Sequence, residues 1–161
     1  AVATYEAKIA LVIESGAAGG TADAGEFSSI GIGLLNSANE EMVWGGLQLN
    51  NASPASDPPP LSVGGFDGAT GNFTTTQRYV GIKQGEFIYI RFRKTTTAAY
   101  TSANTYSMDF SRDGVIYNEF ATGAKTFTAN CDRVGFFFRK PKSQLGTVKT
   151  RVAVDYFRRI L

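Results

Sequence analysis

Apolar and polar residues alternate with a period of two along most of the chain, which predicts β-strands. Segment 87–94 is the clearest case, because Ile90 and Phe92 fall on one face while Arg91 and Arg93 fall on the other. The other strands expected from the same pattern cover residues 5–14, 29–35, 42–49, 78–82, 106–112, 115–121, 133–139 and 150–161. No segment has clear helical periodicity, so the pattern predicts an all-β chain.

The dipeptide Asp113-Gly114 is the strongest turn signal, because both residues tolerate the positive φ of a two-residue type I′ turn. A hairpin centred on it would place Phe110 opposite Tyr117, and Asp109 opposite Asn118 on the other face. We therefore expect a tight hairpin between the strands on either side of this dipeptide.

Segment 50–71 carries four of the five prolines, including three in a row at 58–60, together with Asn, Ser, Asp and Gly. Consecutive prolines cannot donate to a β-ladder, so at most a short edge strand is expected at 61–63. The strands before and after this excursion share one composition. We therefore expect residues 1–161 to form a single domain.

Nine or ten strands separated by turns are typical of a β-sandwich or a closed barrel. We favour a two-sheet antiparallel β-sandwich. Its buried residues are expected to include Ile88, Ile90, Phe92, Phe110, Tyr117, Val134, Phe136 and Phe138.

Four segments in the second half carry a family resemblance: 87–94, 111–117, 133–137 and 154–158. In this order they resemble the strands and hairpin of concanavalin A-like lectin and glucanase jelly rolls, closest to non-catalytic accessory modules of that superfamily. Tyr117 stands where those modules usually have Trp. The resemblance covers about half of the chain, from residue 87 onward. It implies a jelly roll whose concave face carries a carbohydrate.

Composition argues against an enzyme. The chain has no histidine and one cysteine, Cys131, so the commonest general base and the Cys–His pair are both missing. The hydrolases of the resembled superfamily place alternating acidic residues on one strand, whereas Glu40 and Glu41 are adjacent in a loop. The remaining candidates, Asp109, Asp113 and Asp155, are isolated. We expect no catalysis and no cofactor.

No metal site is expected either. Asp67-Gly68 could in principle bind calcium, but one carboxylate in a glycine-rich stretch is more typical of a turn. The 16 basic and 14 acidic residues give a net charge of +2, so the chain lacks the strong positive charge typical of proteins that bind nucleic acid, and no nucleic-acid partner is expected. No apolar run is long enough for a membrane-spanning helix, so membrane insertion is not expected.

One group of residues could bind a ligand. Rings stack on sugars, and charged or amide groups bond to hydroxyls. The outward positions of four strands supply such side chains: Trp44, Gln48, Tyr89, Arg91, Asp109 and Asn118. If they converge on one concave face, they form a glycan site. The alternative is that Trp44 belongs to the core and the others are ordinary solvent-facing pairs.

The sequence therefore predicts a non-catalytic carbohydrate-binding or adhesion module of a surface, secreted or virion-associated protein. The alternative is a structural or interaction protein without a glycan ligand, such as a virus capsid decoration, fibre or tail component. Expected partners are a glycan or other protein chains, including an oligomer or larger assembly. A degenerate hydrolase is the third and weakest hypothesis.

Overall fold

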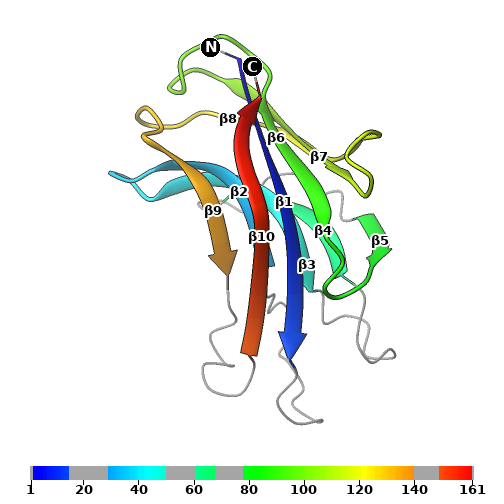
Figure 1. The fold of residues 1–161 in the computed structure, drawn as a ribbon. Coiled ribbons are helices and arrows are strands. Elements are labelled where there is room, and N and C mark those ends of the chain that lie inside the picture. The colour runs from blue at the N-terminus through cyan, green and yellow to red at the C-terminus, as the bar shows by residue number, and fades with distance from the viewer. Residues whose placement is uncertain (1, 15–28, 50–60, 68–77, 140–148, 161) are drawn as a thin grey trace.

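The computed structural model describes residues 2–14, 29–49, 61–67, 78–139 and 149–160 (Figure 1). These residues form ten strands and no helix. The strands are β1 (Ala3–Glu14), β2 (Ser29–Asn36), β3 (Glu41–Leu49), β4 (Leu61–Asp67), β5 (Arg78–Ile82), β6 (Ile88–Lys94), β7 (Asn104–Ser111), β8 (Asn118–Lys125), β9 (Arg133–Arg139) and β10 (Lys149–Ile160).

The strands form two antiparallel sheets that pack as a β-sandwich, as the sequence predicted (Figure 1). Sheet A has the order β10-β1-β6-β7-β8, and sheet B has the order β5-β4-β3-β2-β9. The first strand pairs with the last, and β2 pairs with β9. Strands from the beginning and the end of the sequence therefore lie side by side in both sheets. This pairing brings the edge strands β9 and β10 to the same side of the sandwich (Figure 1).

The core lies between the inner faces of the two sheets. Ile88, Ile90 and Phe92 of β6 are fully buried there, as their alternation predicted. They pack with apolar residues of sheet B such as Ile32 and Leu47. The described residues include no helix with the length and hydropathy needed to cross a membrane.

Sheet B is lined on its outer side by glycine. A Cβ placed on Gly33 of β2 would collide with the Val43 carbonyl oxygen and with the backbone of Trp44 on β3. Its register partner on β9, Gly135, has open space around the same position. Close approach of β2 and β3 therefore requires Gly33 to lack a side chain.

The β7–β8 connection differs from the predicted two-residue turn. Phe110 lies opposite Asn118, and Asp109 lies opposite Glu119, so the register is shifted by one residue. Residues 112–117 form a longer loop in which Gly114 has a positive φ of 76°. The Asp113 carboxylate accepts the N–H groups of Val115 at 2.8 Å and Ile116 at 3.0 Å, which fixes this wider turn.

The predicted edge strand at 61–63 was also wrong. β4 extends to Asp67 and lies between β3 and β5, so it is an inner strand of sheet B. The three consecutive prolines that suggested an edge lie outside the described residues.

Four of the eight residues predicted to be buried are in the core, but the other four are not. Tyr117 lies outside sheet A, on the loop that follows β7. Val134, Phe136 and Phe138 have the inner-face register of β9, yet they stay substantially exposed. Their strand is the edge of sheet B, so no further strand of the described chain covers them.

Candidate functional site

The six side chains proposed for a glycan site do not converge. Tyr89, Arg91 and Asp109 lie on the outer face of sheet A, whereas Trp44 and Gln48 lie on the outer face of sheet B. These faces point away from each other on opposite sides of the sandwich. Alternation correctly placed Trp44 and Gln48 outward from the core, but it did not indicate that their strand belongs to the other sheet.

Trp44 and Gln48 are also buried, at 4% and 0% exposure. Trp44 stacks on Phe137 of β9 with 6.1 Å between ring centroids. The Gln48 amide lies over Gly64, whose missing side chain leaves room for it. These two side chains therefore fill space on sheet B and present no open surface to a glycan.

The outer face of sheet A is organised around one buried carboxylate. Glu6 of β1 is 1% exposed and accepts hydrogen bonds from both neighbouring strands and from the β7–β8 loop. We call this group the Glu6 cluster. Its donors are Arg91 Nε at 2.7 Å, Tyr117 Oη at 2.7 Å, Tyr156 Oη at 2.6 Å, Arg158 Nη2 at 2.6 Å and Arg158 Nε at 3.1 Å.

The cluster keeps Glu6 ionised. Burial by itself would raise the pKa of Glu6, but the hydrogen bonds from Tyr156, Tyr117, Arg158 and Arg91 lower it to about 2. The guanidinium carbon of Arg91 lies 3.4 Å from the centre of the Tyr117 ring, so that ring covers the ion pair. Arg91, predicted as a ligand-binding residue, thus serves an internal ion pair.

Asp109 has a similar internal role. It accepts a hydrogen bond from Arg93 Nη2 at 2.8 Å, and the same nitrogen donates to Ser107 Oγ at 2.9 Å. Tyr89 lies beneath Gly114 and beside Tyr156, with 6.3 Å between the two ring centroids. The polar side chains on the outer face of sheet A therefore form hydrogen bonds and ion pairs largely with one another.

Acid should weaken this arrangement. Because the pKa of Glu6 falls from 4.5 to about 2 on folding, its contribution to stability is complete above pH 5 and is lost as the pH falls toward 2. The loss from this carboxylate should be about 3 kcal/mol over that interval. Urea unfolding at pH 6, 4 and 2.5 measures it, with Glu6→Gln as the control. If the variant and the parent lose stability equally between pH 6 and pH 2.5, Glu6 is not the group responsible.

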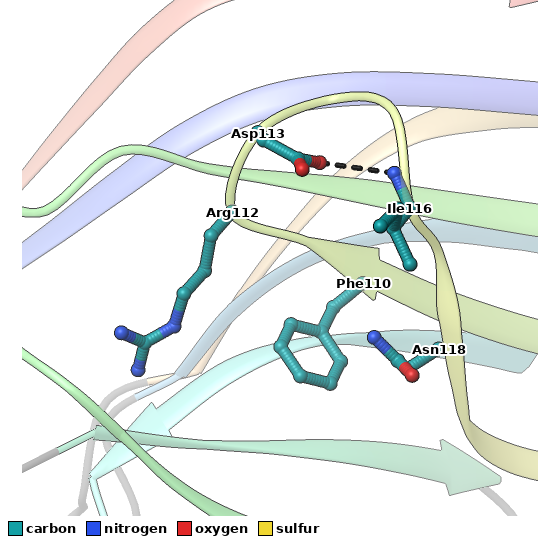
Figure 2. Close-up of a pocket in the computed structure, with 5 residues that line it drawn as sticks. All are labelled: Phe110, Arg112, Asp113, Ile116 and Asn118. Atoms are coloured by element: carbon teal, nitrogen blue, oxygen red, sulfur yellow. Dashed lines mark hydrogen bonds between the residues drawn. The ribbon is translucent and has the colours of Figure 1, made fainter.

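Asn118, the sixth predicted residue, lines a shallow hollow of about 380 Å³ beside the β7–β8 loop (Figure 2). The other lining residues are Phe110, Arg112, Asp113 and Ile116. Figure 2 shows the Asp113 carboxylate turned toward the Ile116 N–H, while the Arg112 side chain and the Asn118 amide flank the Phe110 ring. An apolar floor with an amide and a guanidinium at its rim could hold a small polar ligand.

Two other reactive side chains are held in unreactive states. Burial raises the pKa of the Cys131 thiol to about 12, so the thiolate is scarce at neutral pH. Lys94 is buried at the end of β6, and its Nζ donates to the carbonyl oxygens of Thr96 at 2.7 Å and Ala98 at 2.6 Å. These contacts give Lys94 a structural role at that end of the sandwich.

On the side of the sandwich where β9 and β10 lie, no further strand of the described chain covers their inner faces. Inner-face apolar side chains of both edge strands remain 37–51% exposed there. We call this surface the open edge; its residues are Val134, Phe136, Phe138, Val152 and Val154. At one point the two sheets do meet, because the Phe136 and Phe157 rings lie 5.3 Å apart.

Comparison with protein-family models, curated proteins and solved structures gives no match. The resemblance of the second half to concanavalin A-like jelly rolls therefore remains a prediction. The sequence did not suggest the open edge, where exposed apolar side chains of two described strands lie on the same side of the sandwich.

Proposed function

We propose that this chain is a non-catalytic interaction module that binds another protein chain through the open edge. The observation that carries the proposal is the exposure of five inner-face apolar side chains on two edge strands at the same side of the sandwich. Their register places them toward the core, opposite residues such as Ile32 and Leu11. They are thus core-type side chains that the described part of the chain leaves uncovered.

Exposed apolar patches on soluble domains mark interaction sites more often than chance. Edge strands add a second attraction, because their outward N–H and C=O groups can pair with another strand. β9 and β10 combine both features on one side of the sandwich. A partner chain could bury the five side chains and extend a sheet at the same time.

Carbohydrate binding is the second candidate, and the hollow at the β7–β8 loop is the observation that favours it. Its Asn118 amide and Arg112 guanidinium flank an aromatic floor. The interaction proposal ranks first because the other predicted glycan-binding side chains are buried or engaged in internal hydrogen bonds.

Selection of a displayed library of random dodecapeptides on the immobilised protein tests the proposal. Selected peptides should bind the parent and lose about tenfold or more in affinity with Phe138→Asp, because a charge then lies in the apolar contact. Ile116→Asp is the matched control. Ile116 is an exposed apolar residue in the β7–β8 loop, beside β8 at the other edge of sheet A from β10.

Two results would count against an interaction module. One is a selection that yields no specific peptide, and the other is a set of peptides that bind Phe138→Asp as tightly as the parent. A glycan array run in parallel covers the second candidate. Glycan binding that Asn118→Ala abolishes and Phe138→Asp leaves intact would favour carbohydrate recognition.

A further inference from the structure

We infer that the occupant of the open edge is an extended segment of a different protein, which adds as a strand beside β10 and directs acidic side chains toward it. The inference rests on the proposed function and specifies the partner's conformation and charge. Three properties of β10 carry it: a backbone edge that no second described strand pairs with, the apolar side chains across from it, and its excess of positive charge.

The backbone of β10 offers a long template. The strand has 12 residues, and within the described chain it pairs with β1 alone. In an antiparallel pair, alternate residues direct their N–H and C=O groups away from the partner. β10 therefore has a row of backbone donors and acceptors along its outer edge. A β-bulge near Lys8 and Ile9 interrupts its pairing with β1, and the register is uninterrupted on either side of it.

The exposed apolar side chains determine which face of the added strand must be apolar. Every second residue of a strand beside β10 would point toward the inner face of sheet B, where Phe138 is 51% exposed. Val134 and Phe136 lie along the same face of β9. A segment with alternating apolar residues would cover these side chains and continue the core.

The charges around β10 select acidic residues for the partner's other face. Among the residues whose side chains the structure describes, the outer face of β10 and the paired outer positions of β1 carry three cations and two anions, an excess of one positive charge. They are Lys8, Arg151 and Arg158 against Glu6 and Asp155, whereas Arg159 pairs with Tyr5 in the inner-face register. Arg151 and Arg158 are exposed, and both carboxylates already form ion pairs within the chain.

A second copy of this chain is the less favourable occupant. Two-fold pairing of β10 with itself would bring two surfaces with the same positive excess together, which opposes association. A segment with glutamate or aspartate would instead form opposite-charge cross-strand pairs. We therefore assign the site to a heterologous acidic segment.

Two synthetic nonapeptides test the inference. One has the sequence TVEVTVEVT, and its twin has lysine in place of both glutamates. The glutamate peptide should bind about three- to tenfold more tightly in about 50 mM salt, and this preference should shrink in about 500 mM salt. Arg151→Glu should reverse the preference. Arg112→Glu, which makes the same charge change beside the opposite edge of sheet A, should leave it in place.

Strand addition has its own readout in amide hydrogen exchange. The bound glutamate peptide should slow exchange along β10 and leave β8, the other edge strand of sheet A, unchanged. Protection of β8, or no protection at either edge, would overturn the strand geometry.

Three further results would refute the inference, and each has a different consequence for the proposed function. In the first, the two peptides bind with equal affinity and Phe138→Asp weakens both. This would refute the preference for an acidic partner and leave the proposed function standing. A concentration-dependent dimer in sedimentation that Phe138→Asp abolishes would make a second copy the occupant. Failure of both peptides and of the library selection would remove the inference together with the proposed function.

Discussion

Replacing Glu6 with alanine should lower the free energy of unfolding by about 3–5 kcal/mol, the cost of removing one partner from a buried ion pair. The carboxylate is 1% exposed and receives five hydrogen bonds from four side chains. Its loss would leave two guanidinium groups close together without the anion between them. Urea or thermal unfolding of the purified variant at pH 7 measures the effect.

Lys8→Ala is the matched control for this substitution. Lys8 is two residues along the same outward face of β1, and its Nζ pairs with Asp155 at 2.8 Å. That pair is partly exposed, so its removal should cost less than about 1 kcal/mol. Similar losses for the two variants would mean that the Glu6 cluster contributes no more than an ordinary surface ion pair.

Glu6→Gln separates charge from shape. Glutamine fills nearly the same volume, so the two tyrosine hydroxyls keep an acceptor while the two arginines lose their counter-charge. The variant should therefore be destabilised, though less than Glu6→Ala. The cluster ties β1, β6, β10 and the β7–β8 loop together, so its loss should also loosen the pairing of the two chain ends.

Much of the fold was predictable from alternation alone. All ten strands lie where the pattern placed them, with boundary differences of a few residues for most, and β4 is the one that runs clearly longer than expected. The inner face of β6 was predicted correctly because apolar and polar residues alternate there without interruption. A period of two is enough to assign a side chain to one face of its own strand.

The candidate site depended on information that alternation does not contain. Trp44 and Tyr89 both lie outward, but their strands belong to different sheets, and only the pairing order reveals this. Asn118 was predicted to lie on the outer face, opposite Asp109, but in the structure it lies opposite Phe110. The observed register differs from the predicted one by one residue, and such a difference places a side chain on the other face of the sheet. The longer turn follows from hydrogen bonds of the Asp113 side chain, which the dipeptide signal did not anticipate.

The Glu6 cluster and the open edge were missed for a related reason. Glu6 and Arg158 are 152 residues apart in sequence, so nothing local suggests that they form an ion pair. Phe136 and Phe138 have core-type positions, but burial also depends on whether a strand has neighbours on both sides. A charged residue within a mostly apolar strand, such as Glu6 in β1, is the kind of sequence signal that could have pointed to an outer-face network.

The same substitution at two inner-face phenylalanines should give very different results. Phe92→Ala removes a fully buried ring that packs 5.7 Å from the Tyr106 ring, and it should cost about 3–5 kcal/mol. Phe138→Ala removes a ring that is 51% exposed, so less apolar area is lost and the cost should be about 1 kcal/mol. Chemical unfolding of both variants measures the difference. Equal costs would mean that the open edge is covered in solution by the chain itself, which would remove the observation that carries the proposed function. A small cost at Phe138 together with a large loss of peptide binding would instead show that this ring serves recognition more than stability.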